Sequence, residues 1–139
     1  MFDALQATVK AAAAGLTAQS TRMRVASENL ANAQSTGDTP GSNPYQRKLV
    51  NFRGMLDEMS GADLVTVDRI TRDNAPFRTE YKPGHPAADD KGYVKLPNVD
   101  MLVETADMRE ASRSYTANLQ VIKQAREMVS MTIDLMKVS

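Results

Sequence analysis

Apolar residues recur at alternating steps of three and four residues at both ends of this chain. One row of such side chains begins at Phe2 and holds the spacing for roughly 32 residues, and a second row runs from Met108 to Met136. Heptad spacing of this kind is typical of long helices that pack against other helices. We therefore predict one helix over residues 1–34 and another over residues 101–139.

Details of the two rows indicate how the helices pack. The first row has one polar interruption, Gln19. Gly15, which lies next to the row, lowers the stability of a helix by about 1 kcal/mol but allows another helix to approach closely. In the second helix, Val121, Met128 and Leu135 lie beside the row and widen the apolar stripe. A stripe wider than a two-helix seam predicts contact with more than one partner. One face of this helix is therefore expected to meet another molecule.

The middle of the chain, residues 35–100, has a different composition. It holds every proline and most of the glycines, and these residues end helices and form turns. Four segments are β-branched or loosely alternating and are predicted to be strands: 46–52, 63–70, 77–81 and 93–96. The predicted fold is mainly α with a small β insert. Its long terminal helices pair with one another or pack between molecules, and residues 35–100 form a central Pro/Gly-rich β-hairpin domain.

The composition excludes several classes of function. The 17 basic and 17 acidic residues give a net charge of zero, and they form no basic stripe, which argues against nucleic-acid binding. The chain has no cysteine, so disulfides and thiolate chemistry are excluded. Aromatic residues make up only 5%, which is little for a ligand pocket. We expect no nucleic acid, no small-molecule substrate and no cofactor.

The start of the chain lacks the basic first segment and the continuous apolar core of a secretory signal. No stretch reaches the roughly 18 apolar residues needed to span a bilayer. An exported protein of this kind would need a route other than a cleaved signal.

Candidate catalytic and metal-binding residues are few. His85 is the only histidine and lies in a turn sequence, with no second imidazole or thiolate to share a metal ion. The carboxylates of the insert stand beside basic residues or in polar runs, where a solvated surface is the more common role: Asp57, Glu58, Asp68 and Asp73. No nucleophile-elbow sequence and no glycine-rich phosphate loop occurs. We expect no enzymatic activity, no catalytic residue and no bound metal.

Methionines and asparagines stand out on the predicted helices. Five of the nine methionines lie in the C-terminal segment, where this adaptable side chain fills either a core or an interface between subunits. Asn29, Asn32 and Asn118 lie on or beside seams that otherwise prefer apolar residues. We predict that their amides hydrogen-bond across helices and fix the axial register. The alternative for Asn29 and Asn32 is that they only approach a helix C-terminus, where Asn is tolerated.

Several motifs, in order along the chain, resemble those of the flagellar rod and hook axial protein family. Residues 27–33 read Ser-Glu-Asn-Leu-Ala-Asn-Ala and are followed by Tyr-Gln-Arg-Lys at 45–48, similar to the end of the family's first helix and the strand start that follows it. Residues 111–118, Ala-Ser-Arg-Ser-Tyr-Thr-Ala-Asn, resemble the motif of its last helix. Residues 81–100 resemble the stretch that marks its C-type proximal rod subunits. The likeness covers nearly the whole chain.

The resemblance implies a structural subunit of the basal-body rod, the drive shaft of the flagellum, which polymerises through terminal helices, transmits torque and lines the export channel. It also implies that the helices at 1–34 and 101–139 form an antiparallel coiled coil. It implies export through the flagellar type III apparatus without a cleaved signal peptide, and a final place in the periplasmic space. The implied partners are further copies of the chain, other proximal and distal rod proteins, and the adaptor between the rod and the export ring. The alternatives are another small rod subunit of this family, or a coiled-coil adaptor or secretion chaperone.

The assembly interface is predicted on the two seams and on the widened stripe of the second helix. Seams at opposite ends of a chain close only by pairing with one another or by packing between molecules. The residues expected at this interface are Leu16, Met23, Asn29, Leu30, Asn32, Tyr115, Asn118, Ile122, Met128, Val129 and Leu135.

Overall fold

The computed structural model describes residues 1–138, which form two long helices with a small antiparallel β region between them. This part of the predicted fold is confirmed. The elements in chain order are α1 (Phe2–Ala31), β1 (Lys48–Asp57), β2 (Ala62–Arg72), β3 (Arg78–Tyr81), β4 (Tyr93–Leu96) and α2 (Met101–Val138). The first strand extends further than the pattern predicted, as far as the turn that ends at Gly61, whose φ of 64° suits a glycine.

Short polar side chains set the inner ends of the two helices. Asn32 follows the last residue of α1 with a φ of −100°, and its Nδ2 donates to the carbonyl oxygen of Glu28 at 2.8 Å. Asp100 precedes α2, and its Oδ1 accepts from the backbone nitrogen of Leu102 at 2.9 Å. Both bonds satisfy backbone groups that a helix end leaves without a partner.

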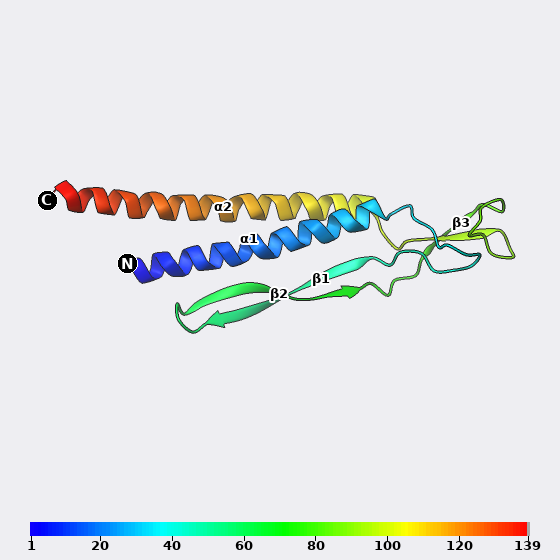
Figure 1. Ribbon diagram of the computed structural model, residues 1–139, viewed down its shortest axis with the longest axis horizontal. Helices are drawn as coiled ribbons and strands as arrows, with labels where there is room; N and C mark the ends of the chain where they lie inside the picture. Colours follow the sequence, from blue (N-terminus) through cyan, green and yellow to red (C-terminus); the bar gives the residue numbers. More distant parts are fainter. Residues whose placement is uncertain (139) are drawn as a thin grey trace.

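The two helices run antiparallel and lie side by side (Figure 1). The two helices are in close contact at Gly15, where an added Cβ atom would lie 2.6 Å from Nδ2 of Asn118 in α2. A side chain at this position would force the Asn118 side chain to move, so glycine leaves room for that amide between the helices. Further along the pair, Arg22 donates from a guanidinium nitrogen to Oδ1 of Asp107 at 2.5 Å.

The helix α2 is longer than α1 and extends past it. Gly15 lies against Asn118 and Asn29 bonds to Glu104, and the residue numbers of both pairs sum to 133. The first residue of α1 therefore lies opposite residue 131 or its neighbours. Residues 132–138, about 10 Å of helix at 1.5 Å per residue, continue beyond α1 (Figure 1). We refer to residues 132–138 as the overhang.

The β1–β2 hairpin lies along α1, which in Figure 1 is seen between the hairpin and α2. Its register runs from the pair Lys48 and Arg72 to the pair Asp57 and Ala62, with one bulge after Asn51. Near its tip, Asp57 accepts from Nζ of Lys10 in α1 at 2.8 Å. An isolated two-stranded hairpin is only marginally stable in water, so this hairpin depends on α1 for its support.

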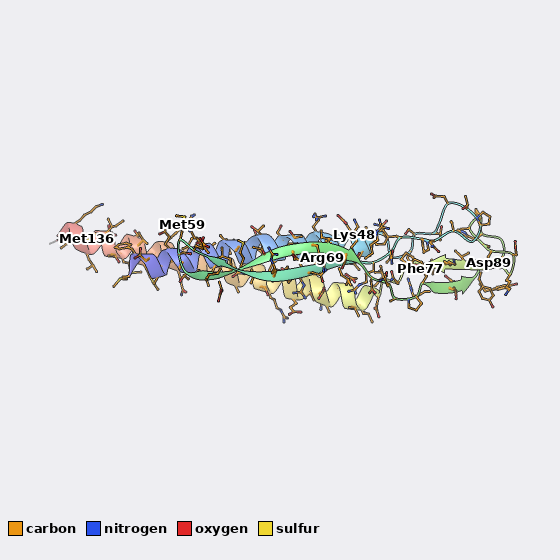
Figure 2. The ribbon with its side chains drawn as sticks, turned by 90° about the horizontal axis from the view of Figure 1, so that it is seen from below. Lys48, Met59, Arg69, Phe77, Asp89 and Met136 are labelled. Carbon is orange, nitrogen blue, oxygen red and sulfur yellow. The ribbon has the colours of Figure 1, made fainter. Side chains whose placement is uncertain are left out.

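The β3–β4 hairpin and its loops form the opposite end of the molecule. Figure 2 shows Met59, at the tip of the first hairpin, and Met136 near one end, whereas Asp89 lies at the other. The rings of Tyr81 and Tyr93 make an edge contact with centroids 5.3 Å apart. Two loops meet here, because the backbone nitrogen of Gly41 donates to the Ala87 carbonyl at 3.2 Å.

The core is small and is shared between the helix pair and β4. Its larger buried apolar side chains are Val25, Val94, Leu96 and Val99. The accessible surface is 9403 Å², whereas a compact monomer of 15.2 kDa exposes about 7,100 Å². The molecule therefore exposes about 2,300 Å² more than a self-contained domain of its mass.

This uneven packing predicts uneven protection of the backbone. In the purified monomer, amide hydrogen exchange should be slowest around Val25 and Ala111, which are 3% and 0% exposed, and fast in the overhang. The measurement is residue-resolved exchange by NMR, with the urea-unfolded chain as the reference. Equal protection along the whole of α2 would contradict this description of the core.

Candidate functional site

A buried side-chain amide joins the inner ends of α1 and α2 to the first strand. Asn29 is 1% exposed, and its Nδ2 donates to the Lys48 carbonyl at 2.9 Å and to Oε2 of Glu104 at 3.1 Å. Its Oδ1 accepts from the hydroxyl of Tyr45 at 2.8 Å and from the backbone nitrogen of Lys48 at 2.9 Å. The amide thus makes all four bonds of which it is capable.

A buried carboxylate completes this group. Glu104, also 1% exposed, accepts from Nε of Arg47 in a short bond, and Arg47 also bonds to Asp73 at 3.3 Å. Burial disfavours the charge of Arg47, but the hydrogen bond and the charge of Glu104 outweigh it and raise the pKa of the guanidinium. Burial also raises the pKa of the Tyr45 hydroxyl, which keeps it protonated as a donor. We call Asn29, Tyr45, Arg47, Lys48 and Glu104 the junction cluster.

The three asparagines singled out from the sequence have three different surroundings. Asn29 hydrogen-bonds to α2 within the subunit, as predicted. Asn32 caps its own helix, which is the alternative that the sequence left open. The side-chain amide of Asn118 lies against Gly15 and makes no hydrogen bond within residues 1–138.

The other residues predicted for the interface fall into two groups. Two of them, Met128 and Leu135, lie on α2 with exposures of 55% and 74%. The remainder are half-buried on the two helices: Leu16, Met23, Leu30, Tyr115, Ile122 and Val129. The structure therefore leaves most of the seam residues half-buried, whereas Met128 and Leu135 of the widened stripe are exposed.

Sequence reasoning singled out only one member of the junction cluster, Asn29. Tyr45, Arg47 and Lys48 stood in a family motif without an assigned role, and Glu104 was missed altogether. A signal for the acid was present, since Glu104 lies seven residues before Ala111 and fourteen before Asn118, on the seam row itself. A charged residue on an apolar row requires a partner of opposite charge. Which basic residue supplies it depends on the tertiary fold.

The residues considered for catalysis take part in turn hydrogen bonds and ion pairs that stabilise the fold. Nδ1 of His85 accepts from the backbone nitrogen of Ala87 at 3.0 Å inside the turn. Among the carboxylates, Asp57 pairs with Lys10, and the hydrogen bond from Lys10 lowers the pKa of that carboxyl. Asp68 and Asp73 pair with arginines. Over residues 1–138, no three His, Asp or Glu side chains are grouped as metal ligands, and neither helix is long and apolar enough to cross a membrane.

Comparison with known proteins gives relatives along nearly the full chain. A chain from Agrobacterium fabrum (strain C58) named flagellar basal-body rod protein FlgC is 58% identical over 138 residues, which cover 99% of both chains. A FlgC from Escherichia coli O6:H1 is 43% identical over 89% of this chain and 92% of its own. One from Bacillus subtilis (strain 168) is 35% identical over 94% of this chain and 97% of its own. This chain belongs to the FlgC family of flagellar basal-body rod proteins.

A wider family also matches the C-terminal part of this FlgC-family chain. The sequence model described as flagellar basal body rod FlgEFG protein C-terminal matches residues 90–135. These residues contain β4, Glu104 and most of α2. The predicted resemblance to rod and hook axial proteins, and to proximal rod subunits among them, is confirmed.

The junction cluster predicts that two neighbouring asparagines differ greatly in importance. Replacing Asn29 by Ala removes four hydrogen bonds and leaves buried partners unsatisfied, so we expect a loss of about 3 kcal/mol or more in the free energy of unfolding. Replacing Asn32 by Ala removes one partly exposed cap and should cost about 1 kcal/mol or less. Urea unfolding of the purified variants measures both. Equal losses would show that the cluster does not stabilise the subunit.

Proposed function

We propose that this chain is a structural subunit of the proximal rod of the flagellar basal body, which polymerises through its terminal helices. The observation that carries the proposal is the surplus of about 2,300 Å² of exposed surface over a compact monomer. A standard protein interface buries about 800 Å² on each partner, so this surplus equals two to three such contacts. Membership of the FlgC family supports the same conclusion.

Much of the exposed apolar surface lies on α2. Eleven apolar side chains of this helix are at least a third exposed, and the most exposed are Leu102 at 83%, Leu135 at 74% and Val138 at 88%. Single exposed apolar residues are normal in soluble proteins, whereas an apolar surface along one helix marks an interaction site. We therefore place contacts between subunits mainly on α2.

The finer assignments are proposals of the same kind. The helices α1 and α2 pack as an antiparallel coiled coil, with residues 1–34 and 101–139 on the inner side of the rod and residues 35–100 on its outer side. Seam residues such as Leu16, Ile122 and Val129 take part in that packing, and Met128 and Leu135 meet neighbouring subunits. Their heptad spacing and their exposure support this division of roles.

The proposed partners are other copies of the chain, the other proximal and distal rod proteins, the adaptor that joins the rod to the export ring, and the type III export apparatus. The proposed location is the periplasmic part of the basal body, reached without a cleaved signal peptide. The chain would transmit torque and line the export channel without enzymatic activity. The rival function of a secretion chaperone is not favoured, because the matched relatives are named as rod proteins.

A charge on the seam should block assembly. Ile122 is half-buried in the helix pair, so Ile122→Asp places a carboxylate where an apolar contact is needed, at a cost of several kcal/mol. The same change at Leu30 should act in the same way. We expect loss of motility and of rod incorporation while secretion of the subunit persists. The control is Gln120→Asp, which adds the same charge at an exposed position and should leave motility intact.

Asn118 tests the proposed register role between subunits. Its amide has no bonding partner within the part of the subunit described, so a partner from a neighbour would fix the axial stagger. Asn118→Leu keeps the branched shape and removes the hydrogen bonds. A register role predicts polymorphic or misassembled polymers in electron micrographs, whereas normal rods with Leu at this position would exclude it.

A further inference from the structure

An open groove of about 600 Å³ lies between α1, β2 and α2. Small residues form much of its helical walls, including Gly15 from α1 and Ala117 from α2, and Asp63 from β2 stands at its edge. The side chains of Gln19 and Asn118 also line it. It is therefore an elongated recess along the helix pair, bounded on one side by the hairpin.

Three polar side chains of this groove lack hydrogen-bond or charge partners within residues 1–138. Oε1 of Gln19 is buried and accepts no hydrogen bond from any described residue, and the Asn118 amide is likewise without a bond over residues 1–138. Asp63 is exposed and forms no ion pair with a basic side chain within residues 1–138. Buried polar groups normally have partners, so the groove is suited to an occupant that brings hydrogen-bond donors and a positive charge.

The overhang of α2 has the complementary chemistry. Residues 132–138 continue beyond α1, and no other described helix covers them. Ile133 and Lys137 lie four residues apart and therefore share one face of the helix. Ile133 is 40% exposed, and Lys137 is an exposed cation with no acidic partner within residues 1–138. This face offers an apolar side chain followed by three N–H donors on one ammonium.

We propose that the overhang of one copy lies in the groove of a second copy, with Ile133 against the small residues at Gly15 and Lys137 beside the carboxylate of Asp63. The opposite charges of Asp63 and Lys137 and the shape of the groove select this occupant. Groove and overhang are different surfaces of the same chain, so the contact is heterologous and repeats from copy to copy, as a ring or as a helical array. This inference rests on the proposed function and assigns two of the surfaces through which the subunits polymerise.

The absence of cysteine makes the contact testable by disulfide formation without background from the chain itself. Two single variants, Asp63→Cys and Lys137→Cys, are expressed together in cells whose own copy of the chain is replaced, and purified basal bodies are oxidised. Within one copy the two positions cannot meet, since Val121 lines the groove and lies about 24 Å of helix before Lys137. A disulfide can therefore form only between copies.

The expected result is a product of twice the 15.2 kDa chain mass that appears only when both variants are present. The matched control replaces Lys137→Cys by Lys123→Cys, an exposed lysine elsewhere on α2, and should lose this product. Three results overturn the inference: no product although both variants are in the rods, an equal yield with the control, or a cross-link only to a protein of different mass.

If the cysteine variants do not assemble, exchanging the two charges tests the same contact. Lys137→Glu should reduce incorporation, and adding Asp63→Lys should restore it, whereas a double variant no better than the single one overturns the inference. The two proposals fail separately. If the unmodified chain is absent from purified basal bodies, the proposed function is wrong, and if the chain is present without the cross-link or the restoration, only the groove contact is wrong.

Discussion

The way in which α1, β1 and α2 meet depends on the hydrogen bonds of one buried amide. Asn29 bonds to both backbone groups of Lys48 in β1 and to Glu104 in α2. A buried amide or carboxylate that loses its partners costs more than an ordinary hydrogen bond contributes. Only one alignment of α1, β1 and α2 satisfies Asn29 and Glu104 together, so the cluster defines the register of the helix pair from its inner end.

Outside this cluster much of the subunit is incompletely packed. Near Gly15 the helices touch through small residues, and beyond residue 131 α2 has no partner helix among the described elements. Apolar side chains that a globular domain would bury are exposed there, including Met59 at 90% and Leu135 at 74%. A molecule with a small core and many exposed apolar side chains is suited to a polymer, in which neighbours supply the missing contacts.

The terminal helices could be predicted from the sequence because their apolar residues repeat with the helical period over many turns. The first helix ends at Ala31, close to the predicted end, and the strand at residues 93–96 has the predicted bounds. The C-terminal end of β1 was harder to predict, since Gly54 interrupts any alternating pattern in the second half of the strand. The packing of the hairpin along α1 could not be predicted, because periodicity shows which face is apolar but not which element covers it.

The candidate site could be predicted from the sequence only in part. Asn29 and Asn32 occur in one motif and have the same side chain, yet one makes tertiary bonds and the other caps a helix. The distinction depends on Glu104 and Arg47, which are 57 residues apart in the chain. Local patterns identify residues that need partners, whereas only the fold determines which partners they receive.

The attachment of the hairpin at both of its ends has a mechanical consequence. The β1–β2 hairpin is fixed to α1 by Lys48 at the junction cluster and by the Lys10–Asp57 pair near its tip. Bending a stack of layers requires each layer to slide past the next, and two attachments separated along the length oppose that sliding. The helix and the hairpin therefore act as one laminated beam, and the bending stiffness of such a beam exceeds the summed stiffness of its separate layers.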